Sequence, residues 1–401
     1  MKILLADSLP DAAVDRLIAA GDDVVAAGHL DADGLGAALP GVEVLVVRST
    51  KVTAAALDEA DELALVVRAG AGTNTIDCAR AAELGIFVCN VPGQNALAVA
   101  ELTMGLLISV DRHIAAATAD LRDGKWNKKA YSQADGLFGK TLGIIGLGDI
   151  GIATAARATA FGIDVIAVDK PGRPASVLDR ADRAGVRYVD DLDTLLASSD
   201  IVSLHVPGGP ETAGMVDAAF LAKMPDGAIL LNTSRGDVVD EAALIDAMET
   251  RGLRAGLDVF ADEPGSGSGE FSSALARHPS VVATHHVGAS TEQAQQAVAD
   301  GTVDTIEAYR SGAVVNCVNM EVEPRRAATL SIRHEDKVGV LAAVLAILRG
   351  SDLNVSTMSN KVFAGAKAAV ATIDVGGVPS DEILQRIKAH EHVINVSVTL
   401  A

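Results

Sequence analysis

The stretch Lys140-Thr-Leu-Gly-Ile-Ile-Gly-Leu-Gly-Asp-Ile-Gly151 begins as an apolar run and breaks into a turn of the form Gly-x-Gly-x-x-Gly. A helical pattern follows from Ile152, and a second apolar run, 163–168, ends at Asp169. A strand, this turn, a helix, a second strand and a terminal acid follow one another in units that bind a dinucleotide. The stretch therefore predicts a doubly wound α/β fold with a dinucleotide bound at the turn.

The three glycines of this turn have separate expected roles. Gly146 permits a tight turn, Gly148 lets backbone amides approach a pyrophosphate, and Gly151 lets the helix pack closely on the strand. The amides and the dipole at the helix N-terminus would then hold the pyrophosphate. Asp149 and Ile150 complete the predicted cofactor loop.

Two acidic residues bear on the choice and strength of cofactor binding. A carboxylate at Asp169 would accept the ribose hydroxyls of NAD and repel the extra phosphate of NADP, so NAD is expected, although Lys170 and Arg173 follow closely. Asp149 lies near the expected pyrophosphate, and two like charges about 6 Å apart repel by roughly 3 kcal/mol at an effective dielectric constant of about 20. The helix dipole favours the same acid by up to about 1 kcal/mol. We therefore expect Asp149 to point to solvent and to weaken the cofactor only modestly.

The composition argues against several kinds of partner. The 401 residues carry a formal net charge of −20, which disfavours nucleic acids and anionic membranes. Cys78, Cys89 and Cys317 match no metal-ligand spacing and are expected to be free thiols in a reducing compartment. The first residues become charged too soon for a signal peptide, and the most apolar later stretch is too short to span a membrane, so a cytoplasmic location is expected.

Alternating strand-like and helix-like segments predict two parallel-sheet domains. A discontinuous, flavodoxin-like substrate-binding domain is expected from residues 1–97 and 289–320, because the helical pattern over 291–310 should rejoin the first half. A Rossmann domain is expected over 98–288, after one long helical pattern over 96–121. A cleft between the two domains would hold a small substrate.

The C-terminal part has a different pattern. Residues 321–327 form a charged, proline-bearing linker. Residues 328–401 then follow the order strand, helix, strand, strand, helix, strand, which predicts a ferredoxin-like module.

Three polar residues follow apolar runs in the predicted Rossmann domain, namely Arg235, Glu263 and His286. Ligands of doubly wound sheets bind at the carboxyl ends of the strands, so these side chains should converge there. Oxidation of a hydroxy acid needs an Arg to hold the carboxylate and a His to take the hydroxyl proton. A Glu would orient the imidazole and stabilise its charged form. The spacing alone is equally compatible with a surface network of ion pairs.

Four motifs of the chain, at 139–151, 232–236, 258–264 and 286–291, resemble those of the D-isomer-specific 2-hydroxyacid dehydrogenase family. The resemblance covers residues 1–320 and implies catalytic roles for Arg235, Glu263 and His286. It also implies that NAD is contacted by the glycine loop, Asp169, Val206, Thr233, Asp258 and Gly288.

Two other histidines lie near the expected site. The family usually has Pro-His where this chain has His285-His286, and the register of the motif assigns the acid/base role to His286. His205, at the end of another apolar run, is expected to be structural.

Within the family, the chain most resembles the members that oxidise 3-phospho-D-glycerate in the first step of L-serine biosynthesis. The segments 47–53, 68–74 and 90–101 are similar to their substrate-side motifs. The resemblance makes Arg48, Ser49 and Asn95 the candidates for the substrate phosphate, beside Arg235. One residue is missing next to Arg48 relative to the common pattern.

The C-terminal module resembles the ACT domain, an amino-acid-sensing unit that those members often carry. Members that bind serine have a His and an Asn in the first loop and a second Asn at a later strand. The corresponding residues here are His334, Asp336 and Asn354, so an acid replaces the first Asn. A dimerisation module without a ligand is an equally good interpretation.

The sequence thus predicts an NAD-dependent dehydrogenase of a phosphorylated 2-hydroxy acid, assembled as a homodimer or homotetramer. A hydroxypyruvate or glyoxylate reductase of the same family is the alternative enzyme. An NAD(H)-sensing corepressor on the same fold is the alternative of another class.

Overall fold

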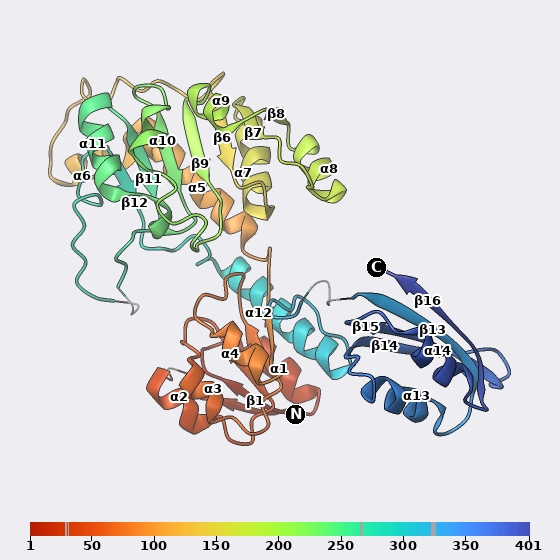
Figure 1. Ribbon diagram of the computed structural model, residues 1–401. Coiled ribbons are helices and arrows are strands. Elements are labelled where there is room, and N and C mark those ends of the chain that lie inside the picture. The colour runs from red at the N-terminus through yellow and green to blue at the C-terminus, as the bar shows by residue number, and fades with distance from the viewer. Residues whose placement is uncertain (29, 31, 265–267, 322–325) are drawn as a thin grey trace. The chain divides into compact units, whose positions relative to one another are not determined.

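The computed structural model describes residues 1–28, 30, 32–264, 268–321 and 326–401. It divides into two compact units, Met1–Asn319 and Met320–Ala401 (Figure 1). The first unit contains two parallel sheets, and the second contains one antiparallel sheet. The domain boundaries predicted within 1–320 stay a prediction.

The first sheet has five parallel strands in the order β2-β1-β3-β4-β5. Their bounds are Lys2–Leu5 (β1), Asp23–Ala26 (β2), Val44–Val47 (β3), Leu65–Arg68 (β4) and Phe87–Asn90 (β5). Alternate residues enter opposite cores. Leu4 packs with α2 (Ala32–Ala38), α3 (Ala54–Asp58) and α4 (Cys78–Glu83), whereas Ile3 and Leu5 pack with α1 (Asp11–Ala19) and α12 (Glu292–Arg310). The last helix of the first unit therefore returns to cover the first sheet.

The second sheet has seven parallel strands in the order β12-β11-β10-β9-β6-β7-β8. Their bounds are Thr141–Ile145 (β6), Asp164–Val168 (β7), Val186–Val189 (β8), Ile201–Leu204 (β9), Ile229–Asn232 (β10), Arg254–Leu257 (β11) and Val281–Ala283 (β12). The strand order reverses between β6 and β9. In doubly wound folds the ligand binds outside the carboxyl ends of the strands at this switch point.

Helices cover both faces of each parallel sheet. Around the first sheet they are Asp11–Ala19 (α1), Ala32–Ala38 (α2), Ala54–Asp58 (α3), Cys78–Glu83 (α4) and Glu292–Arg310 (α12). Around the second they are Ala96–Arg112 (α5), Asp149–Ala160 (α7), Ala175–Arg183 (α8), Leu192–Ala197 (α9), Ala218–Ala222 (α10) and Glu241–Arg251 (α11), with a short 3₁₀ turn at Gly236–Val238 (η1).

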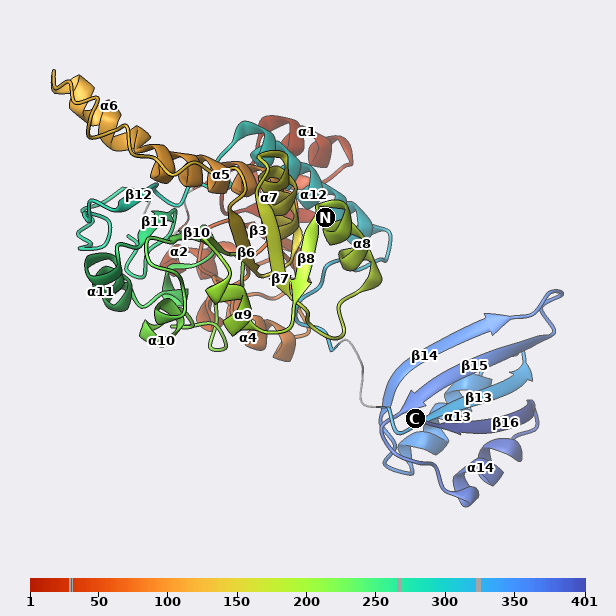
Figure 2. The same ribbon diagram turned by 90° about the horizontal axis from the view of Figure 1, so that it is seen from above.

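The single long helix predicted over 96–121 is wrong. His113 adopts a left-handed conformation with φ +52°, which ends α5 and starts α6 (Ile114–Arg122). Ten residues of α5 are buried against the second sheet and α7, whereas α6 has none that is buried. Helix α6 extends away from the sheet (Figure 2). The helical periodicity continues through the break, so the sequence pattern alone did not reveal it.

The glycine turn is required by close backbone contacts. A Cβ atom on Gly146, where φ is +99°, would lie 2.1 Å from the carbonyl oxygen of His205. A Cβ atom on Gly151 would lie 2.2 Å from the carbonyl oxygen of Gly146. A Cβ atom on Gly148 would meet nothing within 4 Å. Gly146 and Gly151 therefore serve the packing of the turn, whereas the space beside Gly148 is open to a ligand.

The second unit follows the predicted order of strands and helices. It contains Ala328–Glu335 (β13), Val340–Arg349 (α13), Val355–Val362 (β14), Ala368–Val375 (β15), Asp381–Lys388 (α14) and Val393–Leu400 (β16). The sheet order is β14-β15-β13-β16, and the pairs are antiparallel. Leu330, Ile332 and Ile373 lie in the core between the sheet and the two helices.

Among the described residues, no helix is long and apolar enough to cross a membrane.

The two roles of the glycines predict different effects of alanine. Gly146→Ala should destabilise the first unit by more than about 2 kcal/mol, because the added methyl group overlaps a backbone carbonyl and the left-handed φ is strained. Gly148→Ala, where φ is −92° and the space is open, should change the free energy of unfolding by less than about 1 kcal/mol. Urea unfolding of both variants measures the difference, and equal stability of the two would contradict this account.

Candidate active site

The predicted site residues lie at the carboxyl ends of parallel strands. Arg48 follows β3, Arg235 follows β10, and His286 follows β12. Glu263 lies farther along the segment that follows β11. Since parallel strands present their carboxyl ends at one edge of a sheet, this placement concentrates polar side chains there.

His286 and Glu263 form a direct pair. Nδ1 of His286 lies 2.7 Å from Oε2 of Glu263, and Oε1 of Glu263 accepts a hydrogen bond of 2.9 Å from the amide of Phe260. The hydrogen bond to Glu263 raises the pKa of His286 above its usual value, although burial opposes the shift. Burial alone would raise the pKa of Glu263, but the bonds from His286 and the Phe260 amide outweigh it and lower that pKa. The pair is therefore arranged to stabilise a charged imidazole.

The backbone at His286 is held in an unusual conformation. Its φ is +53°, which non-glycine residues adopt rarely. The carbonyl of Asp258 accepts the His286 amide at 2.8 Å. The carboxylate of Asp258, 1% exposed, accepts Thr284 Oγ1 at 2.5 Å and the amides of Val287 and Gly288 at 2.9 and 2.8 Å. Asp258 and Gly288, both predicted to contact the cofactor, thus also fix the loop that carries His286.

The structure distinguishes the three histidines near the site. His286 contacts Glu263, whereas the exposed His285 forms no hydrogen bond or ion pair with Glu263 among the described residues. Burial lowers the pKa of His205 to about 4, so that ring is neutral near pH 7. Nε2 of His205 lies 2.9 Å from the hydroxyl of Ser203. His205 therefore has the environment of a structural residue.

Arg235 is positioned by the buried amide of Asn232. Oδ1 of Asn232 accepts the amide and the hydroxyl of Ser234 at 3.0 and 2.7 Å, and Nδ2 donates to the carbonyl of Arg235 at 2.8 Å. The neighbouring hydroxyl of Thr233, a predicted cofactor ligand, lies 3.0 Å from that of Thr103 in α5. The turn after β10 is thus fixed on both sides of the guanidinium-bearing residue.

Arg68, the last residue of β4, is not among the residues predicted from sequence. Its side chain is largely buried, and Nε has no hydrogen-bond partner among the described residues. Burial lowers the pKa of Arg68 to about 10, and repulsion from the charges of Arg235 and Arg48 adds to the shift. The three guanidinium groups therefore lie near one another. A Cβ atom on Gly70 would lie 1.4 Å from Nη1 of Arg68, so this glycine makes room for the side chain.

The same glycine-rich segment approaches Arg235. A Cβ atom on Gly72 would lie 2.7 Å from Nη2 of Arg235. The loop after β4 in the first sheet and the turn after β10 in the second therefore meet at this side chain. Arg68 could have been found from sequence by the rule that identified Arg235, since it also ends an apolar run.

The loop after β3 is organised by Asp7. Its carboxylate accepts the amides of Arg48, Ser49 and Thr50 at 2.6, 3.0 and 3.0 Å, and the hydroxyl of Ser49 at 2.8 Å. Burial would raise the pKa of Asp7, but these bonds outweigh it and lower the pKa. The Ser49 hydroxyl proton is already used, which weakens the prediction that it binds a phosphate. Asn95 precedes α5 without a side-chain cap bond to the helix.

The cofactor loop fits the phosphate end of a dinucleotide. Gly148 is the N-cap of α7, and no side-chain hydrogen bond caps this end of the helix. Ile150 lies in its first turn, Asp169 is exposed directly after β7, and Val206 lies after β9 on the other side of the switch point. These are the positions that a pyrophosphate and a ribose require in this fold.

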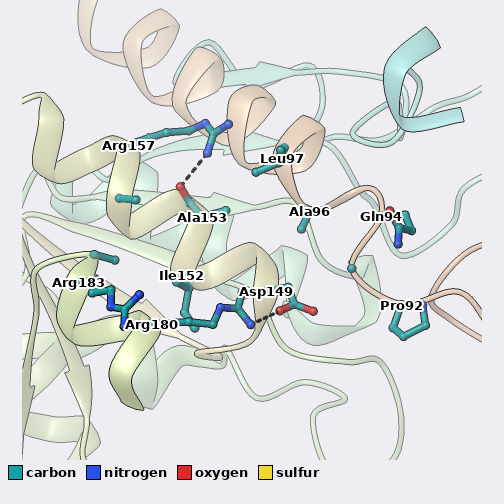
Figure 3. A pocket seen from close by; sticks show the side chains of 13 residues that line it. Pro92, Gln94, Ala96, Leu97, Asp149, Ile152, Ala153, Arg157, Arg180 and Arg183 are labelled. Atoms are coloured by element: carbon teal, nitrogen blue, oxygen red, sulfur yellow. Dashed lines mark hydrogen bonds and ion pairs between the residues drawn. The ribbon is translucent and has the colours of Figure 1, made fainter. Parts of the chain in front are cut away.

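Asp149 is exposed, as expected, but it also forms an ion pair that was not predicted. Its Oδ1 lies 2.7 Å from Nη1 of Arg180 in α8, and both side chains are about half exposed. Figure 3 shows the two facing each other in a pocket of about 620 Å³. The pocket lies between the 92–97 segment and helices α7 and α8, and Arg235 and His286 do not line it. Asp149 and Arg180 are 31 positions apart, so no local sequence pattern indicates the pair.

The predicted effector residues of the second unit differ in exposure. His334 is 2% exposed, with Nδ1 2.7 Å from the Glu335 carbonyl and Nε2 3.1 Å from Oδ1 of Asn360. Asp336 and Asn354 are exposed. Both nitrogens of His334 are thus engaged within the module.

Comparison with known proteins identifies the family. Residues 104–288 match the model of the D-isomer specific 2-hydroxyacid dehydrogenase, NAD binding domain. A hydroxypyruvate reductase from Thermotoga maritima is 46% identical over 284 residues, which cover 70% of this chain and 89% of that protein. A D-3-phosphoglycerate dehydrogenase from Methanocaldococcus jannaschii is 40% identical over 328 residues, 81% of this chain. This chain spans only 60% of the length of that second relative.

Solved structures agree with these relatives. The structure of D-lactate dehydrogenase from Aquifex aeolicus complexed with NAD and lactic acid has a TM-score of 0.65 and is 26% identical. The match covers 78% of this chain and 96% of that one. With the nucleotide-binding turn, the paired His and Glu and the strand-end arginines already described, these matches show that the chain is an NAD-binding oxidoreductase and belongs to the D-isomer-specific 2-hydroxyacid dehydrogenase family.

Proposed function

We propose that the protein oxidises 3-phospho-D-glycerate to 3-phosphohydroxypyruvate with NAD, the first step of L-serine biosynthesis. The observation that carries the proposal is the group of Arg48, Arg68 and Arg235. Among the described residues, no carboxylate within 4 Å forms an ion pair with any of the three, and Nε of Arg68 has no partner. All three arginines are partly buried, and Nη1 of Arg68 and Nη1 of Arg235 donate only to the neighbouring backbone carbonyls of Ala69 and Ser234. Guanidinium groups without a carboxylate partner are suited to a ligand with more than one anionic group.

The charges of this substrate match the arrangement. Its carboxylate would be held by Arg235, which leaves Arg48 and Arg68 at the ends of neighbouring strands for the phosphate. The protein as a whole has a formal net charge of −20, so an anion gains affinity only from such a local group of cations. Asn95 remains a further candidate, and Ser49 is a weaker one.

The proposed mechanism assigns one task to each residue. Arg235 holds the carboxylate and polarises the C2 oxygen, His286 takes the hydroxyl proton, and Glu263 stabilises the resulting imidazolium. Bound NAD would supply the acceptor for the hydride from C2. The backbone of the turn formed by Gly146, Gly148, Asp149, Ile150 and Gly151 would hold its pyrophosphate. Val206, Thr233, Asp258 and Gly288 would line the rest of its site. We propose that Asp169 selects NAD over NADP.

Reduction of hydroxypyruvate is the second candidate, favoured by the 46% identity to the Thermotoga maritima reductase. The two substrates differ by one phosphate, which makes the comparison sharp. NADH oxidation measured with phosphohydroxypyruvate, hydroxypyruvate, 2-oxoglutarate and glyoxylate distinguishes the candidates. We expect the highest kcat/KM with phosphohydroxypyruvate, and a higher value with hydroxypyruvate would overturn the proposal.

The arginine variants extend this test. Arg48→Gln and Arg68→Gln should each lower kcat/KM for phosphohydroxypyruvate by about 10- to 100-fold, because a charge-assisted contact to the phosphate is worth about 1.5–3 kcal/mol. The values for hydroxypyruvate should change by less than about threefold, which also reports that the variants fold. Equal losses with both substrates would contradict the assignment of these residues to the phosphate.

The raised pKa of His286 predicts a direction of pH dependence. Oxidation needs the neutral imidazole, so kcat/KM for oxidation should fall as the pH drops through this pKa. Reduction needs the imidazolium, so its kcat/KM should fall as the pH rises through the same pKa. Glu263→Gln removes the main cause of the raised pKa of His286. It should therefore move the pH dependence of kcat/KM to lower pH in both reaction directions. Profiles measured in both directions check this, and an unmoved pH dependence in the variant would contradict the role of Glu263.

The Asp149–Arg180 pair predicts a linked effect on cofactor affinity. Arg180→Gln should weaken NADH binding by up to about tenfold, because Asp149 would repel the pyrophosphate without its partner. Asp149→Asn should tighten binding by no more than about tenfold, since Arg180 already offsets the charge. The double variant should bind like the native protein. Fluorescence titration with NADH measures all three.

Arg183 is a matched control for this pair, because it lines the same pocket but pairs with Asp179 within α8. Arg183→Gln should leave NADH binding unchanged. An effect equal to that of Arg180→Gln would mean that the net charge of α8, and not the ion pair, controls NADH binding. Hundredfold tighter NADH binding by Asp149→Asn would show that Arg180 does not offset the charge of Asp149.

For the second unit, we propose an ACT-like regulatory or assembly role within a homodimer or homotetramer. The βαββαβ order supports the fold, and exposed Asp336 and Asn354 are the candidate effector residues. The burial of His334 favours a structural task for that ring. Calorimetric titration with L-serine should show binding if Asp336 pairs with the ligand's ammonium group. Absence of heat at millimolar serine would leave assembly as the role.

A further inference from the structure

All three cysteines of the chain lie near one another in the first unit, although they are far apart in sequence. Cys89 belongs to β5, and Cys317 follows α12 and forms an isolated antiparallel bridge with it. Cys78 is the first residue of α4, and its pKa is raised by burial and also by Cys317. All three are free thiols.

The bridge between Cys89 and Cys317 has a specific register. The amide of Asn90 donates to the carbonyl of Asn316 at 3.2 Å, and the amide of Val318 donates to the carbonyl of Val88 at 2.8 Å. The hydrogen bonds therefore flank the two cysteines and do not join them. Cys89 and Cys317 are therefore a non-hydrogen-bonded pair of an antiparallel ladder. In such pairs the Cα atoms are about 4.5 Å apart and the side chains are closest.

We propose that Cys89 and Cys317 form a reversible intrachain disulfide under oxidising conditions. The Cα atoms of disulfide-linked cysteines are about 4.4–6.8 Å apart. The spacing expected of a non-hydrogen-bonded pair lies within this range, so the bond could form without backbone movement. Cys317 is also close enough to Cys89 to contribute to the raised pKa of the Cys89 thiol.

The backbone around Cys317 is already fixed on the sheet. β5 is an edge strand of the first sheet, and the segment with Cys317 covers part of that edge. Asn319 accepts the amide of Val88 at 2.9 Å and donates to the carbonyl of Ile86 at 2.8 Å. The thiol of Cys317 lies 3.2 Å from the same Asn319 side chain. The partner cysteine is therefore held in register before any oxidation occurs.

Exposure determines which thiol reacts first. Cys89 is 1% exposed, whereas Cys317 is partly exposed. Burial, together with Cys317, raises the pKa of Cys89 to about 12, so its thiolate is scarce near neutrality. Cys317 as thiolate would attack a small-molecule disulfide, forming a mixed disulfide and releasing one thiol. Cys89, on losing its proton, would then displace the second thiol: two cysteines and one disulfide yield one cystine and two small thiols.

The new bond would enclose most of the first unit. All strands of the second sheet, from Thr141 to Ala283, lie between Cys89 and Cys317 in the chain. A covalent link across so long a segment restricts the unfolded chain. The oxidised protein should therefore have a higher Tm than the reduced protein, and amides in 86–91 and 313–319 should exchange with deuterium more slowly.

The test uses the full chain, incubated natively with excess oxidised glutathione and then denatured, alkylated and digested with trypsin. The three cysteines fall in separate peptides, 69–80, 81–112 and 311–325. Mass spectrometry should find 81–112 linked to 311–325, Cys78 alkylated, and the link lost after dithiothreitol. Cys78→Ser is the matched control and should retain the link.

Three results would overturn the proposal. The first is a stable glutathione adduct on Cys317 without a link, and the second is a link between 69–80 and 311–325 in its place. The third is no loss of thiols in the native protein while the urea-unfolded chain reacts. The native mapping needs no substitution at Cys89, so a variant that fails to fold cannot obscure the outcome.

Discussion

The buried carboxylate of Asp258 is the interaction on which the proposed site depends. This carboxylate accepts three hydrogen bonds from the loop after β12, and the backbone carbonyl of Asp258 accepts a fourth from the amide of His286. These four bonds hold His286 in a left-handed conformation that few non-glycine residues adopt. The imidazole then meets Glu263 at 2.7 Å, and this contact raises its pKa. The strain in the loop is thus maintained by a carboxylate at the end of β11, in the core of the unit.

The second constraint is electrostatic. Arg48 and Arg68 extend from the first sheet and Arg235 from the second, and their mutual repulsion contributes to the lowered pKa of Arg68. Glycines at positions 70 and 72 create the room that the guanidinium groups occupy. Keeping like charges together costs free energy in the absence of a ligand, and an anionic substrate would remove that cost. The carboxyl-end placement that positions the cofactor turn would also position the proposed substrate residues, because both sheets present these loops from parallel strands.

Much of the fold could be predicted from local pattern. The order of strand, glycine turn, helix, strand and acid predicted the parallel sheet around β6 and β7. The rule that ligands bind at the carboxyl ends of parallel strands predicted a common site for Arg235, Glu263 and His286. The structure pairs His286 with Glu263. The remaining features depend on contacts between distant positions. The burial of Arg68 beside Arg235, the Asp149–Arg180 pair and the meeting of Cys89 with Cys317 join residues 31 to 228 positions apart. The break at His113 was missed because helical periodicity continues on both sides of it.

We propose that Nε of Arg68, which has no hydrogen-bond partner among the described residues, binds the phosphate of a substrate that also carries a carboxylate. The most direct test is a crystal structure of the protein with NADH and 3-phospho-D-glycerate. We expect a phosphate oxygen within about 3.2 Å of that nitrogen and the substrate carboxylate at Arg235. A phosphate bound away from Arg68, with Nε still unpartnered, would contradict it.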